Sequence, residues 1–205
     1  MTTKCANLCF YQFVVFIVIL SLLSGCVHPK NVQISLPIPV EETEKIPLRA
    51  GLYLDKQFTN YSITYLAVIN VGEALSKGAE NIINKAFQEG VTIYTTDLTM
   101  IPKGLDVLVI PEIDRIYVYE HGLGSYWSNT SVIARIKWRI QDMNGKIVFM
   151  NTFTGEDMYK RPANIYSMSS RACKGAAKAL ENHFTKAFVG LTSIKWWELI
   201  KKETN

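Results

Sequence analysis

Hydrophobic and polar residues follow different periods along this chain, and the periods predict its secondary structure. Between residues 48 and 55, Leu and Ala alternate with other residues, which is typical of a half-buried strand. Residues 75–87 instead carry apolar side chains every three or four positions, as an amphipathic helix does. Asn70 and Glu73 have the spacing of a capping box at the start of this helix, and Gly90 is expected to end it.

Two further strands are expected before a hairpin. The segments 91–96 and 105–120 are rich in Val, Ile, Leu and Tyr, and Pro111 is expected to bend the second strand or place it at an edge. Asn144-Gly145 is the preferred pair for a two-residue type I′ turn. Such a turn predicts these cross-strand pairs: Ile140 with Phe149, Trp138 with Asn151, Ile136 with Phe153, and Ala134 with Gly155.

An apolar stripe from Ala172 to Leu191 predicts a final helix from about Ser169, with Gly190 as a candidate break. The order β-α-β-β-β-β-α then predicts an α+β domain. We expect a largely antiparallel or mixed sheet of about five strands, with two main helices packed on one face.

The first residues have the pattern of a secretory signal, because Lys4 is the only charge before the apolar run from Phe10 to Leu23. A transmembrane helix needs about 20 predominantly apolar residues. Residues 6–27 nearly meet that requirement, so length alone leaves both alternatives open.

The tetrapeptide Leu23-Ser24-Gly25-Cys26 resembles the bacterial lipobox. The resemblance implies that residues 1–25 are removed as a lipoprotein signal peptide and that the Cys26 thiol carries a diacylglyceryl group. With a second acyl group on the freed amine, such a modification anchors a protein stably to a membrane. An uncut membrane anchor and a soluble secreted protein remain the alternatives.

Residues 26–46 are rich in proline and predict an extended tether after the lipidated cysteine. Part of this segment, "VQISL" at 32–36, has alternating apolar residues, so packing along the domain as an edge strand is the alternative. Residues 47–205 are expected to form a single domain, with a C-terminal helix and an aromatic tail.

Composition excludes several kinds of site. Cys5 and Cys9 would leave with the signal, so Cys173 would have no partner for an intramolecular disulfide. The 22 basic residues less Lys4 stand against 18 acidic ones, a formal charge of +3, and this mild excess does not indicate nucleic-acid binding. The three histidines, His28, His121 and His183, lack metal-ligand spacing, so we expect neither a metal nor another cofactor.

The lipobox, the proline-rich segment and the order of elements resemble small Gram-negative outer-membrane lipoproteins that face the periplasm, such as the lipopolysaccharide-assembly and curli-secretion lipoproteins. "LRAGLYLDKQF" and "VGEALSKGAENIINKAF" carry the resemblance within the domain. It implies anchoring on the periplasmic face of the outer membrane, because the residue after the cysteine, Val27, is not aspartate.

Three groups of residues are candidate partner contacts. The first is a loop with His121, Tyr126 and Trp127, whose aromatic rings alternatively fold over the sheet edge. The second is the basic strip Arg135, Lys137 and Arg139, alternatively an ordinary exposed strand face. The third is the pair Trp196 and Trp197 near the C-terminus, which suits a membrane interface or a docking groove, or alternatively packs on the core.

No catalytic constellation emerges from the sequence. Ser125 near His121 lacks the nucleophile-elbow pattern, and the carboxylates Glu112 and Asp114 share a strand face without other marks of an active site. We therefore expect a lipid-anchored envelope protein that binds protein or envelope components and is not an enzyme. The alternatives are a subunit of an envelope transport or surface-organelle assembly machine, and an envelope hydrolase acting in a cleft.

Overall fold

The computed structural model describes residues 29–34, 44–94, 101–121, 129–159, 165–198 and 200. They form the predicted α+β fold around a five-stranded mixed sheet with the order β5-β2-β6-β7-β8. The strands are β2 (Ile46–Tyr53), β5 (Phe87–Ile93), β6 (Val107–His121), β7 (Asn129–Asp142) and β8 (Ile147–Tyr159). β2 runs parallel to β5 and β6, whereas β6, β7 and β8 are antiparallel.

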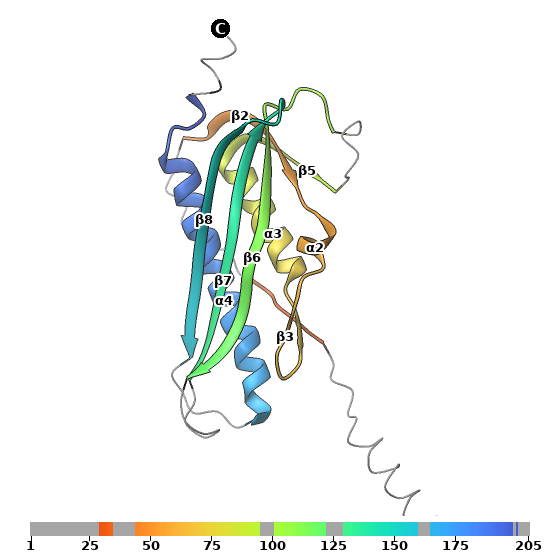
Figure 1. Ribbon diagram of the computed structural model, residues 1–205, viewed down its shortest axis with the longest axis vertical. Helices are drawn as coiled ribbons and strands as arrows, with labels where there is room; N and C mark the ends of the chain where they lie inside the picture. Colours follow the sequence, from red (N-terminus) through yellow and green to blue (C-terminus); the bar gives the residue numbers. More distant parts are fainter. Residues whose placement is uncertain are drawn as a thin grey trace, which may run out of the picture.

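The two long helices, α3 (Gly72–Ala86) and α4 (Ile165–Ser193), cover one face of this sheet, and a short α2 (Lys56–Thr59) lies beside α3. Figure 1 views the sheet from its other side, with the helices behind it. Among the residues that the structure describes, no helix is long and apolar enough to cross a membrane.

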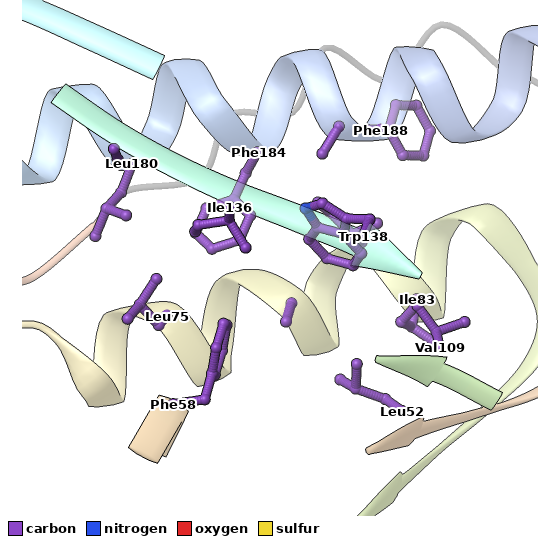
Figure 2. Close-up of a cluster of buried hydrophobic side chains, with 14 of the residues drawn as sticks. Leu52, Phe58, Leu75, Ile83, Val109, Ile136, Trp138, Leu180, Phe184 and Phe188 are labelled. Atoms are coloured by element: carbon purple, nitrogen blue, oxygen red, sulfur yellow. The ribbon is translucent and has the colours of Figure 1, made fainter. Parts of the chain in front are cut away.

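The core lies between the helices and the inner face of the sheet. Ile136 and Trp138 of β7 point toward Phe184 of α4, as Figure 2 shows, and all three are fully buried. Gly78 brings α3 close to α4, because a Cβ atom there would lie 2.1 Å from the Phe184 ring. Dense packing of this kind makes the core sensitive to the loss of even small groups.

A second, smaller sheet has the order β1-β4-β3 and was not predicted. Its strands are β1 (Lys30–Asn31), β4 (Val68–Asn70) and β3 (Ser62–Thr64), with β1 parallel and β3 antiparallel to β4. Residues 30 and 31 form this strand just before the segment 32–36 for which packing was the alternative, and Val32 of that segment is buried against the domain. Residues 35–43 of the proline-rich segment lie outside the described residues.

The predicted ends of the first long helix are corrected by the structure. Asn70 belongs to β4 and donates its side-chain amide to Asn31, while Val71 occupies the N-cap position without a side-chain hydrogen bond. No capping box forms, because the N-cap position falls on Val71, whose side chain has no hydrogen-bonding atom. The helix ends at Ala86 rather than at Gly90, since Phe87 starts a strand that pairs with β2.

The last long helix also differs at both ends from the prediction. It begins at Ile165 and continues through Gly190 to Ser193. Gly190 does not break it; a Cβ there would lie 2.3 Å from the ring of Phe153, so the glycine permits β8 to approach the helix.

The long hairpin confirms all four predicted cross-strand pairs. Its turn, however, is not type I′, which requires positive φ at both central residues. Only Gly145 has positive φ, at 85°, and Asp142 accepts hydrogen bonds from the backbone amides of Asn144 and Lys146. The register shifts by one residue between Ile140 and Gln141, and this bulge accommodates the wider turn.

In β6, residues 107–109 pair with β2, and Pro111 lies just after them. The proline therefore occurs where β6 no longer pairs with β2, at an edge of the sheet. The strand irregularity falls later, between Ile113 and Arg115. Near the other end of β6, Ile93, Leu105 and Leu108 form a second small core. It covers part of the sheet on the side away from the helices, because Leu108 alternates with the inner residues Val107 and Val109.

Candidate functional site

The strongest candidate site is the side of β6, β7 and β8 that faces away from the helices. We call it the outer face and divide it into two sections. The central section comprises Glu112, Asp114, Arg135, Lys137 and Arg139. The distal section lies toward the end of β6 at His121 and the beginning of β7 at Asn129. It comprises Arg115, Tyr117, Tyr119, Ile133 and Met158.

The central section contains the predicted basic strip, now paired with carboxylates from the neighbouring strand. Arg135 lies 3.1 Å from Asp114, and Glu112 contacts both Lys137 at 3.3 Å and Arg139 at 2.7 Å. Each described cation of the strip therefore has an acidic partner. The arrangement indicates a patterned, nearly neutral surface rather than a basic site for phosphate or another anion.

The bulge in β6 adds Arg115 to the outer face, on which Glu112 and Asp114 already lie by ordinary strand alternation. A regular strand would place Asp114 outward and Arg115 inward, but the extra residue lets Arg115 pair opposite Arg135 on the outer face. Ile113 and Ile116, on either side of the bulge, both contact the core. The sequence alternation alone therefore assigned Glu112 and Asp114 correctly to one face, and their ion pairs are the new finding.

The distal section is richer in aromatic and aliphatic side chains. The rings of Tyr117 and Tyr119 lie 5.6 Å apart, and the guanidinium of Arg115 lies 5.6 Å from the Tyr117 ring. On the edge strand, Met158 is 48% exposed. Tyrosine, arginine and methionine are enriched in protein interfaces, so this section has the composition of a contact surface. No motif in the sequence marks these residues, although Tyr117 and Tyr119 alternate along the predicted strand.

Beneath the same strands, α4 contributes a buried histidine without the features of a catalyst. His183 is fully buried, accepts a hydrogen bond from Trp138 Nε1 at 3.1 Å, and contacts the Phe153 carbonyl through Nδ1 at 3.1 Å. Because Nε2 accepts, Nδ1 carries the proton and donates it to that carbonyl. Burial lowers the pKa of His183 to about 4, so the ring is neutral near neutral pH. It satisfies the buried indole N–H and reaches no solvent.

Cys173 also fits a structural role. Its thiol lies 3.6 Å from the Asn31 carbonyl oxygen, and burial raises its pKa above the ordinary thiol value. A raised pKa disfavours the reactive thiolate.

A hollow of about 310 Å³ lies where β1, β4 and α3 meet. Its described lining residues are Asn31, Thr59, Asn60, Tyr61, Asn70, Gly72 and Glu73. Glu73 is its one acidic residue and pairs with Lys77 at 2.6 Å, so this lining offers no acid–base pair. Within the ranges that the structure describes, no group of three or more histidine, cysteine and acidic residues is arranged to hold a metal.

Three predicted site residues, Cys26, Tyr126 and Trp127, lie outside the described residues. The side chain of His121 also lies outside them, although its backbone ends β6. These predictions therefore stay predictions.

The predicted tryptophan pair is corrected in part. Trp196 is only 4% exposed, packs between Phe87 and Phe149, and donates its indole N–H to the Leu191 carbonyl. The core-packing alternative holds for this residue, because the chain folds back onto the sheet after α4. Trp197 lies edge-on to it at 5.8 Å and is half-buried.

No family model and no curated protein matches this sequence. Among solved structures, the chain is similar to a Xanthomonas campestris protein of the DUF330 family, with a TM-score of 0.48 and 11% identity over 86% of this chain and 97% of that one. A minor lipoprotein from Acinetobacter baumannii gives a TM-score of 0.44 and 8% identity over 73% of this chain and 94% of that one.

A candidate lipoprotein from Caulobacter crescentus gives a TM-score of 0.45 and 11% identity over 74% of this chain and 91% of its own. The solved structures that resemble this one thus include bacterial lipoproteins. At these TM-scores the similarity supports no inference about activity or partners.

Proposed function

We propose that this chain is a lipid-anchored cell-envelope protein that binds a protein or another envelope component and catalyses no reaction. The observation that carries the binding role is the outer face. Its three long strands present ion-paired side chains in the centre and aromatic and methionine side chains at the distal end. A patterned face without a described helix over it suits recognition of a partner surface.

The anchor is proposed from the sequence. Leu23-Ser24-Gly25-Cys26 supplies the lipobox resemblance, and Val27 favours retention in the outer membrane. The mature protein would then begin at Cys26 on the periplasmic face. Acyl chains contribute about 0.8 kcal/mol per buried methylene, so two or three chains hold a domain at a membrane without a spanning helix.

The non-catalytic part of the proposal is supported by the described titratable groups. The histidine with the perturbed pKa is sealed in the core, and the carboxylates Glu112 and Asp114 are occupied by ion pairs on an open face. General acid–base catalysis needs such groups beside a substrate in a sheltered site. These positions offer no such shelter.

Intact mass and membrane fractionation test the anchor. The wild-type protein is expected to begin at residue 26 with added acyl mass and to remain in the membrane fraction. Cys26→Ala should lose both properties, because it removes the lipid acceptor. Cys173→Ala is the matched control and should keep them. A full-length, unmodified wild-type chain in the membrane would contradict the proposal and favour an uncut anchor.

A charge-swapped pair tests the binding face. The double variant Asp114→Arg with Arg135→Asp can re-form the ion pair in the opposite orientation, so the fold should remain stable while the pattern seen by a partner is reversed. Co-purification from solubilised membranes should lose the partners that wild-type protein retains. Equal recovery of the same partners with the swapped variant would count against this face. A partner in fixed stoichiometry would indicate a subunit of an envelope assembly.

A further inference from the structure

The N-terminal end of the described chain is attached firmly to the domain. Val32 is 4% exposed, and its amide donates to the Asn70 carbonyl at 3.0 Å. The Lys30 ammonium donates to Ser169 Oγ of α4 at 2.8 Å. β1 is thus held both by β4 and by the beginning of α4, and the lipid-attachment residue Cys26 lies only four positions before Lys30.

The pairing of β1 fixes the direction in which the preceding residues leave the domain. Lys30 pairs with Ile69 and Asn31 with Asn70, in parallel. Each step back along β1 therefore corresponds to a step back along β4, toward the turn of the β3–β4 hairpin. We call residues 65–68 the hairpin tip.

The hairpin tip has an unusual composition for an exposed turn. It reads Tyr-Leu-Ala-Val, without the glycine, asparagine, aspartate or proline that favour tight turns. Leu66 is 52% exposed and Val68 is 38% exposed. The Tyr65 hydroxyl donates to the Glu120 carboxylate, which fixes the tip beside the distal end of β6. An exposed apolar turn held rigidly in place is typical of a contact with an apolar phase.

The hairpin tip lies within reach of the short segment that joins Cys26 to β1. An extended chain spans at most about 3.6 Å per residue, so Cys26 lies no farther than about 14 Å from Lys30. Leu66 lies three positions before Ile69, the partner of Lys30, and the chain turns between them, so the two residues are at most about 10 Å apart. Figure 1 shows the hairpin, the beginning of α4 and the distal ends of β6 and β7 at the same end of the molecule.

We propose that the hairpin tip rests on the lipid surface, with Leu66 in the interface beside the acyl chains on Cys26. This inference depends on the lipidation of Cys26 in the proposed function. The domain then stands directly on the membrane instead of being carried on a long tether. The distal section of the outer face lies near the bilayer, and the turn at 143–146 lies at the opposite end, about 40 Å of strand away.

Site-specific fluorescence on the lipidated protein tests this arrangement. In a Cys173→Ser background, Leu66→Cys or Met143→Cys receives a polarity-sensitive dye, and the protein is reconstituted into phosphatidylethanolamine and phosphatidylglycerol vesicles carrying nitroxide-labelled headgroups. Met143 is the matched position because it is 45% exposed, at the opposite end of the hairpin. The dye at 66 should lose most of its emission and shift to the blue, whereas the dye at 143 should change little.

Intact mass of each sample separates the two proposals. A lipidated protein whose dyes are equally unquenched would overturn the membrane contact and leave the anchor intact. A protein without lipid would overturn both. Val32→Asp, which places a charge in the buried contact of β1, should reduce quenching at 66, while Gln33→Asp, at the adjacent exposed position, should not. Equal quenching in both variants would show that the docked strand does not position the tip.

Discussion

The two faces of the β6–β8 ribbon are made from the same strands and have opposite properties. On β7, Ile136 and Trp138 are fully buried under α3 and α4. Between and beyond them, Lys137 and Arg139 lie on the outer face and pair with Glu112 of β6. Residues that are adjacent in sequence therefore contribute either to the core or to the surface.

This difference separates stability from recognition. Burial of large apolar side chains contributes kilocalories per residue, whereas exposed ion pairs contribute about 0–1 kcal/mol each. The outer face can consequently change its pattern with little effect on folding. A surface that is not needed for stability and is still ordered by the strands beneath it is suited to a binding role.

The largest difference between the faces should appear at Trp138. Trp138→Ala should lower the free energy of unfolding by about 3–5 kcal/mol, because it leaves a cavity and removes the indole donor from His183. Lys137→Ala, the neighbour on the outer face, should change it by no more than about 1 kcal/mol. Urea denaturation of both variants measures the comparison. Similar losses would contradict the division between the faces.

The next effect should come from acid, through the buried His183 of α4, which packs against the inner side of the sheet. Burial holds the pKa of His183 at about 4, below the ordinary histidine value, so the unfolded chain binds a proton before the folded chain does. The neutral, buried His183 therefore contributes to the free energy of unfolding fully above pH ~6.5. This contribution is lost as the pH falls toward 4, by up to about 3 kcal/mol.

Denaturation at a series of pH values tests this effect. The wild type should lose stability more steeply between pH ~6.5 and 4 than His183→Asn, which has no imidazole to titrate. Parallel pH profiles for the two proteins would mean that the histidine is not held neutral by the core.

The smallest effect should come from neutralising the central section. Glu112→Gln together with Lys137→Met removes charges from the outer face and should change the free energy of unfolding by about 1 kcal/mol or less. The change should shrink further at high salt, because exposed pairs are screened. A larger, salt-independent loss in denaturation experiments would show that the outer face also supports the fold.

Local sequence patterns predicted the main sheet, the two long helices and the hairpin register well. The four hairpin pairs followed from alternation and from Asn144-Gly145, both of which act over short distances. The turn type differed because the Asp142 carboxylate binds the turn amides. The small sheet was missed because its strands are too short to show a period, and Asn70 was read as a helix cap because its partner, Asn31, is distant in sequence.

The candidate site was predictable to a similar extent. The basic strip on β7 was visible as alternate residues, but its pairing with Glu112 and Asp114 depends on the strand register and on the bulge in β6. Trp196 could not be assigned from its lysine-rich surroundings, because its burial between Phe87 and Phe149 results from the path of the chain after α4. Long-range contacts of this kind leave no short-range pattern in the sequence.

Photo-crosslinking in the cells that produce the protein tests whether the outer face is the contact surface. A photoreactive amino acid would replace Met150 on the outer face of β8 or Val189 on α4, which are 57% and 56% exposed. We expect a specific adduct in the envelope fraction from position 150 and none from position 189. Adducts from position 189 alone, or equal adducts from both, would contradict this expectation.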